Sequence, residues 1–204
     1  MPDFAGREEI PRSPKTSLRD RLLAQRKSSS PSARQAAAVA VHTTLLSLVR
    51  RVRPSTIAAY APIGGEPGGS DLPSVLAAIA EVLLPVLLPD GDLDWAAYRG
   101  SLVTGPRGLL QPPGPRLGVE AVRHATLVVV PALAVDRSGM RLGRGGGSYD
   151  RVLARLAADV LTVALLNDGE LLDAVPAEEH DRPVWAVITP GGGLTLSPGA
   201  EWTK

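Results

Sequence analysis

The feature that most constrains the fold of this chain is the alternation of short apolar runs with segments of helical periodicity. The apolar runs have the length of strands, and most are apolar on both faces, at 56–60, 82–88, 127–130, 162–166 and 184–188. Strands of this kind that alternate with helices are typical of a parallel sheet covered on both sides. The alternation therefore predicts an α/β fold, a single three-layer α/β/α domain with a mostly parallel, Rossmann-like central sheet.

Helices are expected between these runs. Ser13-Pro14 and Ser30-Pro31 each pair an N-cap residue with a first-turn proline, and they predict helices that end near Lys27 and Arg51. Further helices are predicted near 71–80 and 148–158, further strands near 93–98 and 194–196, and Pro/Gly-rich or glycine-ending loops at 104–118 and 131–147.

The 204 residues suit one domain, which we place at 15–204 behind a disordered tail of residues 1–14. That tail has no apolar core of a signal peptide, and no apolar run reaches the length of a membrane span. The chain has no cysteine, which excludes disulfides and thiolate metal sites and fits a reducing cytoplasm. We therefore expect a cytoplasmic protein with no membrane partner.

The charge of the chain is nearly balanced but unevenly distributed. A formal net charge of +1 gives no general attraction to nucleic acid, so no nucleic-acid partner is expected. Residues 1–53, however, hold eleven Lys/Arg against four Asp/Glu. This segment is either a solvated basic helix face or a set of cations that faces an anionic ligand.

The segment Arg141-Leu142-Gly143-Arg144-Gly145-Gly146-Gly147-Ser148-Tyr149-Asp150-Arg151, here named the glycine loop, carries the most specific chemistry. Consecutive glycines allow several backbone N–H groups to converge on an anion, and the helix that follows adds its positive end. Arg141 and Arg144 add donors suited to phosphate, and Asp150 is placed to hold Mg²⁺ against phosphates.

A plain surface turn before a helix, with Asp150 favouring the helix dipole, is the alternative interpretation of this segment. The arginines, the tyrosine and the acid favour phosphate binding. The loop is neither a P-loop, because no Gly-Lys-Ser/Thr follows, nor a dinucleotide fingerprint, because no GxGxxG opens directly from a strand.

Three segments follow predicted strands and hold nearly all the unusual residues, at 61–69, 131–150 and 167–181. Ligands of open α/β sheets bind at the carboxyl ends of the strands, so we expect these segments to meet there. Lys15 and Arg19 are four residues apart and share a helix face, which suits two cations that reach one polyphosphate. Such a pair is more often simply solvated.

The stretch from Pro131-Ala132-Leu133-Ala134-Val135-Asp136 through Gly139 to RLGRGGGSYDR closely resembles the signature of the 5-formyltetrahydrofolate cyclo-ligase family (5,10-methenyltetrahydrofolate synthetases). The resemblance spans about residues 15–190. Its other parts are Lys15-Thr16-Ser17-Leu18-Arg19, Tyr60 to Glu66, Gly108-Leu109-Leu110-Gln111-Pro112, and Pro176 with His180-Asp181.

The resemblance implies a catalytic domain with a fold similar to sugar-phosphate isomerases and CoA-transferases. It implies ATP and Mg²⁺ as cofactors, a folate substrate, and a monomer or weak homodimer. The implied reaction closes 5-formyltetrahydrofolate to 5,10-methenyltetrahydrofolate. A sugar-phosphate enzyme of the same fold and a non-catalytic folate- or nucleotide-binding protein are the alternatives.

Site residues also follow from the resemblance. Catalytic roles fall to Lys15, Arg19 and Arg144, metal binding to Asp150 and Asp181, and folate binding to Ala61, Glu66, Arg144 and Tyr149. ATP binding falls to Lys15, Arg19, Arg141, Gly143, Arg144, Gly145, Gly146, Gly147, Ser148 and Tyr149. The sequence departs from the family pattern at Gln111, Gly146, Ser148 and Trp185, and at Arg107, where an aromatic residue is common.

Overall fold

The computed structural model describes residues 13–178 and 181–197. Ser13 and Pro14, the end of the predicted tail, already cap and begin the first helix, while residues 1–12 lie outside the described part. The helices are α1 (Pro14–Ser28), α2 (Pro31–Val52), α3 (Leu72–Ala77) and α4 (Ser148–Arg155), with 3₁₀ turns η1 (Pro106–Gly108) and η2 (Val119–His124).

The strands of the main sheet fall close to the predicted runs, and the other strands are two or three residues long and lie in segments where no strand was predicted. In chain order, the strands are β1 (Thr56–Ala58), β2 (Glu81–Leu87), β3 (Leu93–Ala97), β4 (Val103–Thr104), β5 (Leu110–Gln111), β6 (Leu127–Pro131), β7 (Ala134–Asp136), β8 (Arg141–Leu142), β9 (Leu161–Leu165), β10 (Leu171–Leu172), β11 (Ala186–Thr189) and β12 (Gly193–Leu196).

Within the described residues, the main sheet has seven strands in the order β12-β11-β9-β6-β1-β2-β3. The pairs from β11 to β2 are parallel, and only the two edge strands, β12 and β3, pair antiparallel with their neighbours. The prediction of a mostly parallel sheet is confirmed. All five parallel strands consequently end at the same edge of the sheet.

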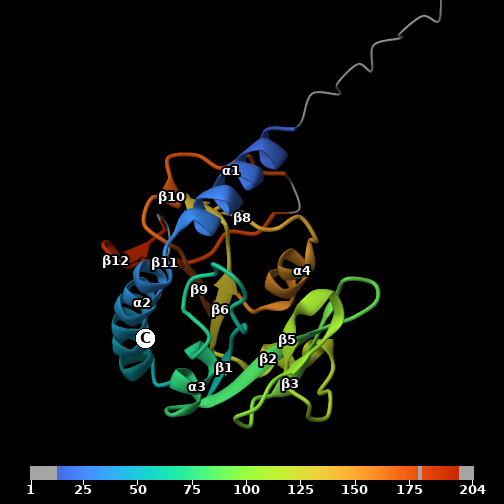
Figure 1. The fold of residues 1–204 in the computed structure, drawn as a ribbon. Coiled ribbons are helices and arrows are strands. Elements are labelled where there is room, and N and C mark those ends of the chain that lie inside the picture. Colours follow the sequence, from blue (N-terminus) through green and yellow to red (C-terminus); the bar gives the residue numbers. More distant parts are fainter. Residues whose placement is uncertain (1–12, 179–180, 198–204) are drawn as a thin grey trace, which may run out of the picture.

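Side chains along the parallel strands alternate between two cores, one on each face of the sheet. In β6, Val129 packs with α2 and α3, whereas Val128 and Val130 pack with η2 and α4. Figure 1 shows α2 and α4 on opposite sides of the strands, with α1 lying across one end of the sheet. The three-layer arrangement is confirmed, because strands that are apolar on both faces need cover on both faces.

The N-termini of α1 and α2 form as the sequence predicts. The hydroxyls of Ser13 and Ser30 accept hydrogen bonds from the N–H groups of Thr16 and Ala33, at 3.2 and 3.1 Å, and a proline follows each cap. α2 ends at Arg53, whose backbone adopts the left-handed conformation with φ of 53°. The chain then turns directly into β1.

Both predicted loops contain short strands. In segment 131–147, β7 pairs with β8 and β10 to form a small second sheet, and in segment 104–118, β4 pairs with β5. Asp136 closes the turn between β7 and β8, where its carboxylate accepts from Ser138 and from the N–H groups of Met140 and Val175. Two-residue strands give little periodicity, so the composition of these segments indicated only loops.

Among the described residues, no helix is both long and apolar enough to cross a membrane.

Candidate active site

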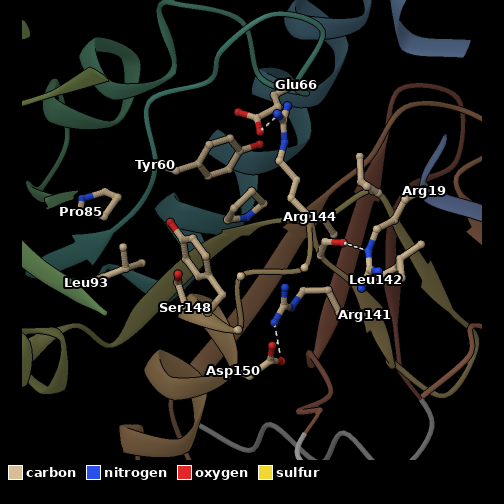
Figure 2. A pocket seen from close by; sticks show the side chains of 18 of the residues that line it. Arg19, Tyr60, Glu66, Pro85, Leu93, Arg141, Leu142, Arg144, Ser148 and Asp150 are labelled. Atoms are coloured by element: carbon tan, nitrogen blue, oxygen red, sulfur yellow. Dashed lines mark hydrogen bonds and ion pairs between the residues drawn. The ribbon is translucent and has the colours of Figure 1, made fainter. Parts of the chain in front are cut away.

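A cavity of about 590 Å³ lies where the parallel strands end. All three segments that were expected to meet at this edge contribute to its lining, as do α1 and the β2–β3 hairpin. Figure 2 shows Arg19 and Arg141 on one side of the cavity and Pro85 and Leu93 on the other. One side therefore carries most of the cations and the glycine loop, and the opposite side includes an apolar surface.

The glycine loop needs glycine at several positions for separate physical reasons. Gly145 and Gly147 have φ of 100° and 66°, a region that side chains disfavour. A Cβ atom at Gly143 would lie 2.9 Å from Arg141 Nη1. Gly147 is the N-cap of α4, and no side chain within the described residues caps that terminus. The start of α4 is consequently available to an anion.

Arg141 is held beneath this loop by Asp150. Arg141 Nη2 donates to Asp150 Oδ1 at 2.6 Å, and the arginine is only 5% exposed. Its Nε atom is buried without a hydrogen-bond partner in the described structure. A buried donor at the cavity wall that lacks an acceptor is what an anionic ligand would satisfy.

Helix α1 brings Lys15 and Arg19 to the same side of the cavity, as their spacing predicts. Lys15 Nζ donates to Asp181 Oδ2 at 2.7 Å and lies 2.9 Å from Glu178 Oε1. Burial alone would lower the pKa of Lys15, but the hydrogen bonds with Asp181 and Glu178 outweigh it and raise that pKa, so the amine stays charged. Arg19 Nε donates to Gly143 O at 2.9 Å, which fixes α1 against the glycine loop.

Glu66 and Arg144, both assigned to the folate side, meet across the cavity. Arg144 Nη2 lies 3.1 Å from Glu66 Oε1, and Glu66 Oε2 accepts from the N–H of Ile63 at 3.0 Å. Ala61 also lines the cavity. The loop that carries Ala61 and Glu66 is fixed by a hydrogen bond, in which Tyr60 Oη donates to Pro67 O at 2.7 Å. Figure 2 shows Arg144 reaching from the glycine loop toward Glu66.

Tyr149 and Ser148 begin α4 at the cavity wall but have different surroundings. The Ser148 hydroxyl donates to Gly91 O at 2.5 Å and so ties the glycine loop to the β2–β3 turn. The Tyr149 hydroxyl is buried without a partner among the described residues. Burial raises the pKa of Tyr149 well above its ordinary value, so this hydroxyl remains a hydrogen-bond donor.

The structure places both carboxylates assigned to the metal at the cavity, each in an ion pair. Asp150 pairs with Arg141 and Asp181 with Lys15. No group of three or more His, Cys, Asp or Glu side chains suited to a metal ion occurs in the described residues. The two carboxylates fit Mg²⁺ only if phosphate oxygens and water complete its coordination, which is the usual arrangement for this ion.

The sequence model of the 5-formyltetrahydrofolate cyclo-ligase family matches residues 11–190 of this chain. The chain belongs to this family. A relative from Mycolicibacterium smegmatis, named 5-formyltetrahydrofolate cyclo-ligase, is 44% identical over 90% of this chain and 97% of its own length. A protein of the same name from Escherichia coli K12 is 30% identical over 81% of this chain and 94% of its own length.

Solved structures agree with this membership. The NMR structure of Aquifex aeolicus 5,10-methenyltetrahydrofolate synthetase has a TM-score of 0.78 and 25% identity, covering 93% of this chain and 96% of its own. A Mycoplasma pneumoniae 5,10-methenyltetrahydrofolate synthetase, 17% identical with a TM-score of 0.69, covers 86% of this chain and 98% of its own and shares the fold.

Two charged residues at the cyclo-ligase cavity, Glu178 and Arg26, were not assigned from the sequence, and Arg26 is the buried one. It lies on the cavity face of α1 and donates to both oxygens of buried Glu170, at 2.7 Å each, and to Ala132 O at 2.6 Å. Lys15, Arg19, Leu22 and Arg26 are spaced by four, three and four residues, which places them on one helix face. That spacing was the available signal. Nothing in the sequence indicated that Pro85, Leu87 and Leu93 would line the cavity, because apolar strand residues at a cavity cannot be distinguished in sequence from those of the core.

Proposed function

We propose that this chain catalyses the ATP-dependent closure of 5-formyltetrahydrofolate to 5,10-methenyltetrahydrofolate, with release of ADP and phosphate. The family match and the two cyclo-ligase relatives support this function. The structural observation that carries it is one cavity with a cationic, glycine-lined side and an apolar side. Such a cavity can hold a polyphosphate and a largely apolar ring system next to each other.

The cationic side is the proposed ATP site. Lys15, Arg19 and Arg141 supply fixed positive charge there, and the free N-terminus of α4 supplies backbone N–H donors. The unpartnered Nε of Arg141 supports this assignment, since a phosphate oxygen would complete its hydrogen bonding. The glycines of the loop allow a phosphate to approach the backbone closely.

The opposite side is the proposed folate site. Ala61 and Glu66 lie on one loop of this side, and Pro85, Leu87 and Leu93 form an apolar surface on which a ring could pack. Glu66 and the Tyr149 hydroxyl offer an acceptor and a donor to the polar edge of that ring. Arg144 lies between the two sides and is placed to contact both ligands.

The proposed chemistry is phosphoryl transfer followed by ring closure. The formyl oxygen attacks the γ-phosphorus of ATP, which releases ADP and gives an N5-iminium phosphate. N10 then attacks the activated formyl carbon, loses its proton, and phosphate departs with the former formyl oxygen. Positioning and charge neutralisation supply most of the catalysis in such transfers, and Lys15, Arg19 and Arg144 are the proposed contributors.

Asp150 and Asp181 are the proposed Mg²⁺ ligands, together with phosphate oxygens. The ion would supply additional positive charge at the phosphates. Both carboxylates are already ion-paired, Asp181 with Lys15 and Asp150 with Arg141. We infer that Lys15 and Arg141 would bind phosphate oxygens when the two carboxylates bind the metal. This exchange keeps every charge at the site compensated.

The assay for the proposed function follows the strongly absorbing product. Purified protein mixed with 5-formyltetrahydrofolate, ATP and Mg²⁺ is expected to form 5,10-methenyltetrahydrofolate and one ADP per product. Omission of ATP is expected to abolish the signal. Binding of both ligands without product would instead support a non-catalytic binding protein, and binding of sugar phosphates but not ATP would support the other alternative.

A further inference from the structure

Arg107 differs from the other cations of the cavity. Among the described lining residues, five Lys or Arg side chains have hydrogen bonds or ion pairs, namely Lys15, Arg19, Arg26, Arg141 and Arg144. Arg107 lines the same cavity, yet none of the hydrogen bonds or ion pairs of the described structure involves it. A cation in this position is available to an anion that enters from solution.

The neighbours of Arg107 place it on the apolar side of the cavity. It lies in the turn between β4 and β5, two residues before Leu109 and three before Leu110, which line the cavity with it. β5 in turn packs near β2, the strand that carries Pro85 and Leu87. Arg107 therefore belongs to the wall opposite the glycine loop.

The backbone of Arg107 is held in an unfavourable conformation. Its φ of 57° and ψ of 22° fall in the left-handed region, which costs free energy for any residue with a side chain. Gly108, the next residue, also has a positive φ, of 73°. A glycine at position 107 would adopt this turn more readily, so the arginine is not explained by the local backbone.

We propose that the Arg107 guanidinium binds a carboxylate of the glutamate moiety of the folate substrate. This inference rests on the proposed function. The triphosphate has its own cations at the glycine loop, so the anion that remains for the apolar wall is the carboxylate end of the folate. A planar guanidinium pairs with a carboxylate through two parallel hydrogen bonds. Arg107 is accordingly a specificity-determining residue that distinguishes folates from pteridines without glutamate.

Calorimetric binding to the full chain tests this contact without relying on turnover. Arg107→Gln removes the charge but keeps a side chain at the positive φ. It is expected to weaken binding of 5-formyltetrahydrofolate about tenfold. Binding of 5-formyltetrahydropteroyl amide, which has the same rings but neither glutamate nor a free carboxylate, is expected to be unchanged, as is binding of Mg·ATP. Arg107→Lys should retain part of the affinity.

Matched controls separate this contact from general charge and from folding. Arg116→Gln removes an exposed arginine of a nearby loop that does not line the cavity, and it is expected to leave folate affinity unchanged. Arg107→Gly also removes the guanidinium but relieves the backbone conformation. It should weaken folate binding as Arg107→Gln does while the melting temperature stays equal or rises.

Three results would overturn the proposal. They are equal folate affinity of wild type and Arg107→Gln, an equal loss for the analogue without glutamate, and a loss confined to Mg·ATP. Failure of the proposed function looks different, because the wild-type chain would then bind 5-formyltetrahydrofolate in an Arg107-dependent manner but form no methenyl product. A wild-type chain that does not bind the folate at all would refute both.

Discussion

At the scale of single residues, the cavity is charged but internally compensated. Arg141 pairs with Asp150, Lys15 with Asp181, and Arg144 with Glu66, so that three of the cations proposed for the ligands already have a carboxylate partner. Desolvating an unpaired charge is costly, and this pairing stabilises the charged side chains of the pocket. Ligand binding must therefore exchange partners, and single substitutions will affect stability as well as chemistry.

Asp150→Asn is expected to lower turnover about 100-fold and to raise the Mg²⁺ concentration needed for half-maximal rate. Because it also leaves the nearly buried Arg141 without its counter-charge, we expect a loss of roughly 2 kcal/mol in unfolding free energy. Steady-state rates over a Mg²⁺ titration and urea unfolding measure the two effects. Asp159→Asn, at an exposed position, is the control. Unchanged activity in Asp150→Asn would place the metal elsewhere.

Tyr149→Phe separates a ligand contact from a structural one. The Tyr149 hydroxyl has no hydrogen-bond partner in the described part of the chain, so its removal should leave stability unchanged or raise it by about 1 kcal/mol. If the hydroxyl donates to the substrate, kcat/KM for the folate should fall about tenfold. Since burial raises the pKa of Tyr149, the wild-type rate should show no tyrosine titration up to pH 10. Destabilisation with unchanged kinetics would contradict this role.

At the scale of elements, α1 is held by a small apolar cluster together with buried charge. Leu22, with Leu18 and Leu23 beside it, packs against Leu133, Ala134, Leu142 and Val175. Leu22 and Arg26 are the buried residues of this helix. Arg26 donates to Ala132 O just beyond the end of β6, and the backbone N–H and the side-chain amide of Asn167 donate to the Glu170 carboxylate. This buried network positions Lys15 and Arg19, which sit further along the same helix face.

Arg26→Met should undock α1 without removing any proposed ligand contact at the phosphates. It leaves Glu170 buried and unpaired, and we expect a loss of about 3 kcal/mol in unfolding free energy. A rise in the KM of ATP larger than the fall in kcat is the expected kinetic signature of misplaced Lys15 and Arg19. Arg26→Met with Glu170→Met should recover part of the stability. An unchanged KM for ATP would show that α1 docks by other contacts.

The small sheet beneath the glycine loop should be sensitive to acid through Asp136. Burial alone would raise the pKa of Asp136, but hydrogen bonds from Ser138, Val175 and Met140 lower it below its ordinary value. The carboxylate therefore stabilises the fold above its unfolded pKa of about 4, and this contribution disappears as pH falls through the folded pKa.

Asp136→Asn should accordingly lose about 2 kcal/mol at pH 7 and less at pH 3. Urea midpoints at both pH values measure the difference. Asp173→Asn is the matched control, because this exposed aspartate pairs with the exposed Arg137. Equal destabilisation by Asp136→Asn at both pH values would contradict the role of its charge.

At the scale of the whole molecule, the parallel sheet gathers distant segments at one edge. Residues from α1, the 61–69 loop, the β2–β3 hairpin and the glycine loop share one cavity there with Glu178 and Asp181. Saturating Mg·ATP should therefore slow amide hydrogen exchange in both 15–27 and 141–150, which are far apart in sequence. Exchange in α3, which lies away from the cavity lining, should be unchanged. Protection of the glycine loop without α1 would contradict a shared phosphate site.

The sequence alone determined the order of the α-helices and of the main-sheet strands, the parallel sheet and the glycine loop, because these depend on periodicity, caps and local torsions. It also placed Lys15 and Arg19 on one helix face. Only the tertiary structure decided which charges meet, as Arg141 with Asp150 and Arg26 with Glu170 do. It also paired the short strands β7, β8 and β10 and built the apolar wall opposite the loop. Such contacts join residues that are distant along the chain, and their energies depend on burial, which local sequence does not specify.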